Sequence, residues 1–292
     1  MKNLSNYILE AKTKIQDADI RQPKSRFELE MLISGAFKRK QYNLNYIDTS
    51  KITDMSELFE GVKHNFDVSS WDVSNVKDMS KMFSRCDAFT GKGLENWDVS
   101  NVKDMSYMFT DCFKFNCDLS NWDVSNVTDM SHMFDSCSIF IGKGLENWDV
   151  SNVTNMYSMF LHCKKFDCDL SNWDMSNVTN TSLMFSNCAK FTGKGIENWN
   201  VSKVKSMYAM FGDCKNFNCD VSNWDVSNVT DMDSMFVNCK KFTGKGLENW
   251  NVSKVKTMRY MFNGCKFNYH ELDWDLSGLS SQLKTFHNYL GN

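Results

Sequence analysis

Eleven cysteines carry the most reactive side chains in this chain. Three of them, Cys117, Cys168 and Cys219, recur every 51 residues, and the other eight each follow a tryptophan by 15 residues. Because free cysteine is among the most buried residue types, this spacing favours a ladder of small apolar side chains in a reducing compartment. Disulfide bonds between adjacent thiols remain an alternative, since neighbouring strands lie about 4.8 Å apart. The loose spacing of the cysteines and the lack of accompanying histidines argue against a zinc site. The ladder members are Cys86, Cys112, Cys137, Cys163, Cys188, Cys214, Cys239 and Cys265.

Two sets of carboxylates also recur at fixed places beside the tryptophans. One set directly follows the tryptophan, with Asn200 and Asn251 replacing Asp in two repeats, and the other precedes alternate tryptophans by two residues. The alternatives are a solvated polar face, an acidic binding face, and a row of oxygens that accepts calcium. We predict no bound metal, and the candidate binding residues are Asp72, Glu95, Asp98, Asp123, Glu146, Asp149, Asp174, Glu197, Asp225 and Glu248.

A Gly-Lys-Gly triplet recurs once every 51 residues. It does not match a phosphate-binding loop, in which the lysine comes after the second glycine and is followed by Ser or Thr. The glycines instead indicate a turn that needs a positive φ. A secondary hypothesis is a basic docking edge with a spacing of roughly 10 Å, twice the strand separation, formed by Lys92, Lys143, Lys194 and Lys245.

No recurrent combination of side chains suggests catalysis. The five histidines are scattered and lack a repeated Ser, Cys or carboxylate partner at a fixed spacing. Hydrolases and transferases need a nucleophile, a base and an orienting group that converge in one place. We therefore predict that the protein is not an enzyme and uses no cofactor.

The elements that position these side chains follow from a tandem repeat. The nine tryptophans are separated alternately by 26 and 25 residues, apart from a final gap of 24, and Ile47 fits the same frame. A fixed period in this range is typical of an array in which each repeat buries its apolar face against its neighbours. We call one such repeat a rung, number its positions from its tryptophan, and count about ten rungs.

Within a rung, two different apolar spacings follow one another. In one example Leu119, Trp122 and Val124 follow the spacing L-x-x-L-x-L, whose last two positions alternate as in a strand. The residues from Val127 to Phe140 have the spacing of a short helix with one buried face. The fold class predicted is therefore an α/β repeat solenoid of leucine-rich-repeat type, with one short parallel strand and one short helical segment per 25 or 26 residues. Met at positions 8 and 11 and Phe at positions 12 and 18 are expected to form core ladders.

The repeat motif L-x-x-W-D-V-S-N-V-T-D-M-S-x-M-F-x-x-C-x-x-F resembles the tandem 25-residue repeat of BspA-like surface proteins and mycoplasma lipoproteins, a bacterial variant of the leucine-rich repeat. The resemblance covers residues 47–286. It implies a right-handed leucine-rich-repeat-type solenoid and a role in adhesion or protein binding. It supplies no catalytic residues.

The two ends of the chain depart from the repeat. Residues 1–45 are predicted to form a helical cap, with a first helix around Leu4 to Ile15 and a second that begins at a capping box of Ser25 and Glu28 ahead of apolar Phe27, Met31, Leu32 and Phe37. Residues 46–292 form the predicted solenoid, in which 274–292 is a degenerate capping rung.

Charge and composition narrow the functional classes. The formal net charge is -3, which argues against a non-specific nucleic-acid binder. No signal peptide or apolar run of membrane-spanning length is evident, which favours a cytoplasmic protein unless it is exported by an unrecognised route.

The function expected is a non-catalytic scaffold that binds a protein partner. Its contact surface is either the polar, acidic strand face or the variable helical edge, where the lysines become denser toward the C-terminus, as in Lys164-Lys165 and Lys240-Lys241. The alternatives are a surface adhesin of BspA-like type and an intracellular inhibitor or effector from a phage or other mobile element. The oligomeric state is left open.

Overall fold

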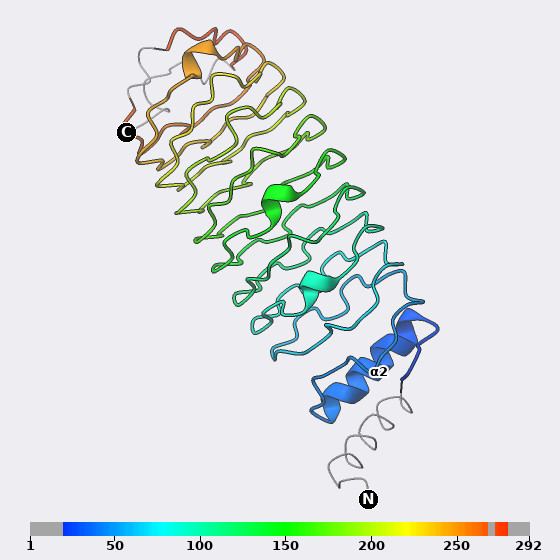
Figure 1. The fold of residues 1–292 in the computed structure, drawn as a ribbon. Helices are drawn as coiled ribbons and strands as arrows, with labels where there is room; N and C mark the ends of the chain where they lie inside the picture. Colours follow the sequence, from blue (N-terminus) through cyan, green and yellow to red (C-terminus); the bar gives the residue numbers. More distant parts are fainter. Residues whose placement is uncertain (1–19, 268–271, 280–292) are drawn as a thin grey trace, which may run out of the picture.

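The computed structural model describes residues 20–267 and 272–279 and consists of irregular coils stacked side by side along one axis (Figure 1). The helix α2 (Arg26–Lys38) lies at the N-terminal end of the stack. Three 3₁₀ helices, η1 (Leu94–Asn96), η2 (Leu145–Asn147) and η3 (Leu247–Asn249), each lie just before a tryptophan.

The predicted parallel strand in each rung is wrong, and with it the α/β solenoid of leucine-rich-repeat type. The described residues contain no strand; consecutive rungs are joined by isolated parallel bridges, eight of which run in sequence from Asp54 to Thr257. These bridges fall seven residues after the tryptophan rather than beside it. Turns within the rung explain why no strand forms, since the Trp97 amide donates to Leu94 (3.0 Å) and the Val102 amide to Val99 (2.9 Å).

The predicted helical segment in each rung is also wrong. In the rung of Trp97, the amide of Tyr107 donates to Ser131 of the next rung, whereas the amide of Met108 donates back to Met105. This alternation continues along the segment, and it replaces the repeated bonds to the fourth preceding residue that define an α-helix. Tyr107 and Asp111 both have a φ of 58°, which interrupts a right-handed helix.

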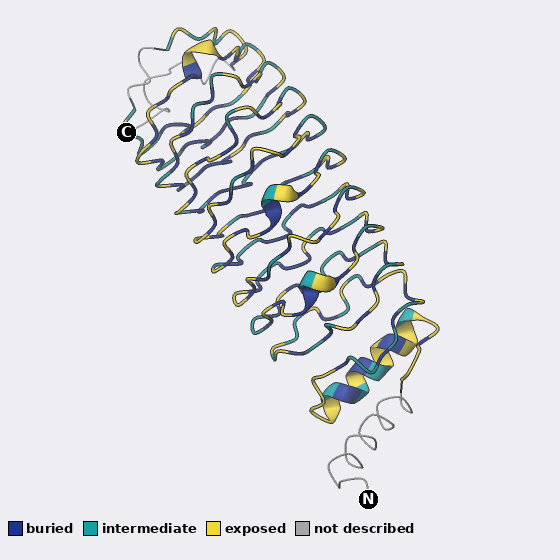
Figure 2. Cartoon of the chain, viewed as in Figure 1, coloured by how far each residue is buried: buried dark blue, intermediate teal, exposed yellow. Residues whose placement is uncertain are grey.

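The apolar ladders are confirmed. The tryptophans of eight rungs, from Trp71 to Trp250, are 2–4% exposed. All nine indole Nε1 atoms donate to a backbone carbonyl of the preceding rung at 2.8–3.2 Å. The Phe rings at position 12 stack between rungs with centroids 5.5–5.8 Å apart, from Phe59 to Phe262. Figure 2 shows the buried segments following one another along the whole stack.

Two polar ladders fix the register between rungs. In six rungs, an asparagine at position 4 donates its amide to a serine carbonyl of the preceding rung, as in Asn126 to Ser100 at 2.8 Å. The eight ladder cysteines direct Sγ at a phenylalanine carbonyl of the preceding rung at 2.9–3.1 Å. All eleven cysteines are free thiols. The register therefore rests on hydrogen bonds as well as on burial.

Burial raises the pKa of Cys117 to about 12, and its neighbour Glu95 adds to the shift. The thiolate is the reactive form, so native protein at pH 8 is expected to resist iodoacetamide, whereas the denatured chain should be alkylated at every cysteine. Because the folded pKa lies above the ordinary 9.0, this thiol supports folding below pH 9, and that support is lost as the pH rises toward 12. Mass spectrometry after timed alkylation checks the first result, and rapid labelling of native Cys117 would contradict it.

The helix α2 begins at the predicted cap, since the Ser25 hydroxyl accepts a bond from the Glu28 amide. Its buried face is Leu29, Ile33 and Ala36. Phe27 and Met31, expected among the apolar residues behind the cap, are 70% and 60% exposed. The reason is the spacing, because positions four and seven residues after Leu29 share its face of a helix.

Three predictions about the ends are not settled by the described residues. The predicted first helix and the final residues of the degenerate rung, 280–292, lie outside them. The boundary at residue 45 stays a prediction, although Asn43 already pairs with Asp67 of the next coil.

Candidate binding groove

The aspartates that follow the tryptophans are exposed, as predicted, and each has a second structural role. One carboxylate oxygen accepts a bond at 2.9–3.1 Å from the amide of the serine two residues later. These bonds hold the carboxylates in one orientation at the edge of each rung. Hydrogen bonds from the serine hydroxyl and amide lower the pKa of Asp98, Asp149 and Asp225, so these three are ionised at neutral pH. The set is Asp72, Asp98, Asp123, Asp149, Asp174 and Asp225.

The glutamates that precede alternate tryptophans organise the Gly-Lys-Gly turns. Glu95 accepts a bond from the Gly93 amide at 2.7 Å, and Glu146 and Glu248 repeat this contact. Gly93 has a φ of 96°, so the predicted positive-φ turn is confirmed. Glu95, Glu146 and Glu197 are half-buried and Glu248 is exposed.

A hollow of about 320 Å³ brings predicted residues from two rungs together. It is lined by Glu95, Asp98 and Asp123, together with Asn96 and Asn121. No lysine or arginine lines it. Carboxylates gathered without a cationic neighbour attract a positive charge. An amine or guanidinium group is the kind of ligand that this hollow suits.

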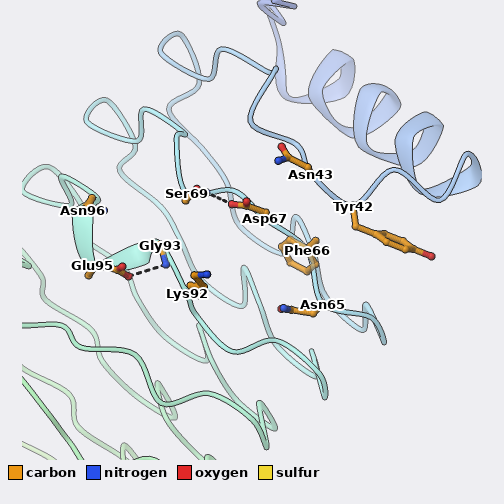
Figure 3. A pocket seen from close by; sticks show the side chains of 10 residues that line it. All are labelled: Tyr42, Asn43, Asn65, Phe66, Asp67, Ser69, Lys92, Gly93, Glu95 and Asn96. Carbon is orange, nitrogen blue, oxygen red and sulfur yellow. Dashed lines mark hydrogen bonds between the residues drawn. The ribbon is translucent and has the colours of Figure 1, made fainter. Parts of the chain in front are cut away.

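Glu95 also lines two neighbouring hollows, so it forms the wall between all three. The first, about 560 Å³, has Lys92, Asn116 and Asp118 on its sides. The second, about 480 Å³, lies beside the end of α2 (Figure 3). We call the three together the Glu95 groove.

The hollow in Figure 3 combines aromatic and charged side chains. Tyr42 and Phe66 lie at one end, and Asp67, Lys92 and Glu95 lie along the other side. Burial opposes ionisation of Asp67, but hydrogen bonds from Ser69 outweigh it and its pKa is lowered. The groove therefore changes character along its length, from mixed near α2 to acidic near Asp98.

The predicted basic edge is already neutralised along most of its length. Lys143 pairs with Asp118 at 2.7 Å, and the same contact recurs at Lys194 (3.1 Å) and Lys245 (2.8 Å). The lysine contact, with hydrogen bonds from the neighbouring serines, lowers the pKa of Asp118 and Asp220 to about 2. Lys92 also lowers the pKa of Asp67 through its charge. These lysines thus have intramolecular partners, which weakens the hypothesis of a free docking edge.

The carboxylates that pair with these lysines were not predicted from the sequence. Asp67, Asp118, Asp169 and Asp220 precede alternate tryptophans by four residues and recur every 51 residues, so their period matches that of the lysines. Two columns with opposite charge and the same period are the signal that identifies such pairs.

A second set of carboxylates that was not predicted from the sequence lies at the positions of the parallel bridges. Asp78, Asp104 and Asp129 are half-buried and stack on consecutive rungs. Burial raises the pKa of Asp231, the last aspartate of this column. Nearby, Asp233 is almost fully buried and accepts bonds from the Arg259 guanidinium at 2.7 and 2.8 Å.

Within residues 20–267 and 272–279, no three His, Cys, Asp or Glu side chains are placed so that they could hold a metal ion. No helix in that part of the chain has the length and apolar character needed to span a bilayer.

Rungs in register and a polar groove define the class as a tandem-repeat protein built from stacked coils. The chain belongs to the family described as Mycoplasma protein of unknown function, DUF285, whose model matches residues 28–143, 117–195 and 186–290. The three overlapping matches agree with the tandem repeat. A search of curated proteins finds no match.

Proposed function

We propose that the protein is a non-catalytic scaffold whose Glu95 groove binds a basic segment of a protein partner. The observation that supports this proposal is the hollow that gathers Glu95, Asp98 and Asp123 from two rungs. Each aspartate is held by a serine amide, so its orientation is fixed before the partner arrives. Such preorganisation reduces the ordering cost of binding.

The arrangement is repeated once more with all of its charges. Glu146, Asp149 and Asp174 occupy the equivalent positions 51 residues later, whereas the next two copies have Asn200 and Asn251 in place of the first aspartate. Residues 71–172 contain nine Lys and Arg against fifteen Asp and Glu. This half of the stack therefore attracts a basic partner most strongly, and two adjacent sites add their effects.

The proposal predicts that Asp98→Asn with Asp123→Asn weakens binding of a fluorescent oligolysine peptide by about tenfold or more and flattens its salt dependence. Asparagine is compatible with the turn, since Asn200 accepts the same bond from the Ser202 amide at 3.2 Å. Fluorescence anisotropy at two salt concentrations gives both quantities.

The control is Asp72→Asn with Asp225→Asn, which removes the same number of charges from the same type of turn outside the Glu95 groove. It should leave the affinity nearly unchanged. Equal binding by the groove variant and the native protein would discard the acidic groove, and an equal loss in the control would reduce the effect to net charge.

The resemblance of the repeat motif to that of BspA-like surface proteins supports a second candidate, a surface adhesin. Its motif carries that resemblance through Trp97 to Phe115 and the equivalent rungs. Protease treatment of intact host cells separates the candidates. Degradation of the protein supports the adhesin, and a protein confined to the cytosolic fraction supports a scaffold, inhibitor or effector that acts inside the cell.

A further inference from the structure

A column of lysines follows one edge of the stack at positions 16 and 17 after the tryptophans. We call these two positions in the rungs of Trp71 to Trp250 the turn edge. Six of the seven rungs from Trp97 onward carry lysine there, and all eight lysines are exposed. They are Lys114, Lys164, Lys165, Lys190, Lys215, Lys240, Lys241 and Lys266.

These lysines differ from those of the Gly-Lys-Gly turns in their partners. Across residues 20–267, none of the eight forms an ion pair, whereas Lys143, Lys194 and Lys245 each do. Lys240 donates to the Gly264 carbonyl at 2.9 Å, a contact that leaves its charge uncompensated. Asp87, the acidic residue of the turn edge, is paired with Lys63 at 3.0 Å.

Stacking of like charges on successive rungs is unfavourable. The rungs are joined by parallel bridges, and paired strands lie about 4.8 Å apart, so lysines on neighbouring rungs repel one another. The repulsion ends when an array of anions lies along the edge. The turn edge is therefore suited to a partner that carries many negative charges.

Apolar side chains at the N-terminal part of this edge indicate what carries those charges. Phe113 and Ile139 belong to the turn edge and are 43% and 40% exposed, and the adjacent Ile141 is 47% exposed. None of these residues lines the hollows of the Glu95 groove. A basic row continued by exposed Phe and Ile is the combination that binds the headgroup region of a membrane.

We propose that the turn edge docks the protein on the surface of an anionic lipid bilayer. The lysines meet the lipid headgroups, and Phe113, Ile139 and Ile141 enter the boundary between headgroups and acyl chains. This site is separate from the Glu95 groove, so the two proposals succeed or fail independently. A nucleic acid is the rival partner, and the experiment below distinguishes it.

The test is flotation of the full chain with vesicles of phosphatidylcholine, either alone or with added phosphatidylserine. The native protein should partition onto the anionic vesicles at least about tenfold more than onto the neutral ones, because each lysine near the surface adds attraction. Reversal of four turn-edge charges should abolish this preference, and circular dichroism confirms that the variant is folded. The four changes are Lys164→Glu, Lys165→Glu, Lys240→Glu and Lys241→Glu.

A matched control carries the same change in net charge on four exposed lysines that lie six residues after a tryptophan, outside both the turn edge and the Glu95 groove. It should keep most of the preference for anionic vesicles, since those side chains lie outside the turn edge. Glutamine at the same four turn-edge positions provides a milder variant, should the charge reversal fail to fold. The control changes are Lys77→Glu, Lys103→Glu, Lys205→Glu and Lys256→Glu.

Three results would overturn the proposal. One is absence of native protein from the anionic vesicles, and another is an equal loss in the turn-edge and control variants. The third is single-stranded DNA binding that depends on the turn-edge lysines and outcompetes the vesicles, which would assign the edge to nucleic acid.

A Phe113→Ser and Ile139→Ser variant should detach from the vesicles at a lower salt concentration than the native protein.

Discussion

Phe160→Ala is expected to lower the free energy of unfolding by about 3–5 kcal/mol, the usual cost of removing a fully buried ring. The ring is 0% exposed and stacks on Phe134 at 5.7 Å and Phe185 at 5.6 Å. The ring centroid of Phe166, in the same rung, lies 4.2 Å from that of Phe160. The cavity would therefore interrupt the aromatic ladder in the middle of the stack, where rungs on both sides depend on it.

Denaturant titration followed by tryptophan fluorescence and far-ultraviolet circular dichroism measures this effect. The matched control is Phe113→Ala, which removes the same ring from a position that is 43% exposed and should change stability by less than about 0.5 kcal/mol. Similar midpoints for the two variants would show that Phe160 is not in a packed interior.

Gly144→Ala is expected to destabilise the protein by about 3 kcal/mol, through the sum of a left-handed backbone and a clash. Gly144 has a φ of 95°, and an added Cβ would lie 2.2 Å from the Ser120 backbone nitrogen and 2.6 Å from the Leu119 carbonyl carbon. Backbone atoms of the preceding rung cannot rotate away as a side chain can. The substitution must push two rungs apart.

Gly61→Ala separates the two contributions to that loss. Gly61 also has a positive φ, 76°, but an added Cβ there meets nothing within 4 Å. It should cost only the backbone penalty, about 1–2 kcal/mol. Thermal unfolding of both variants provides the comparison, and equal losses would mean that Gly144 does not lie against the preceding rung.

Within the rungs, the sequence was sufficient to predict which side chains are buried. The period of the tryptophans placed Trp148, Phe160 and Cys163 in the interior, where they are at most 2% exposed. Burial follows from apolar residues that recur at the same place in every rung, whatever the backbone does between them.

The backbone conformation could not be predicted in the same way. Apolar spacing reports which residues face inward, and turns that face inward every third or fourth residue give the same spacing as a helix. Ten residues after the tryptophan, the rungs carry non-glycine residues with a positive φ. Examples are Lys81, Tyr107 and Ser158, whose φ is 56–58°. Inter-rung hydrogen bonds override their local preference, and no single-residue propensity reveals this.

The candidate groove was predicted in part. The exposed Asp98 and Asp123 were expected, and so was the turn around Gly93. The pairing of Lys143 with Asp118 was not, because the two residues belong to different rungs and their contact depends on how the turn crosses the neighbouring coil. For α2, the capping residues identified the start of the helix, whereas the exposed Phe27 was expected among its apolar residues.

Hydrogen exchange of the nine indole Nε1–H groups tests most directly whether rungs stack in register. Each group donates to the preceding rung, for example Trp148 to Leu119 at 3.2 Å and Trp173 to Leu145 at 2.8 Å. Nuclear magnetic resonance in D₂O should therefore show slow exchange for the eight buried indoles from Trp71 to Trp250, with Trp274 faster. Exchange of most of the eight at the rate of a free indole would show that the tryptophans face water and that neither the Glu95 groove nor the turn edge exists as described.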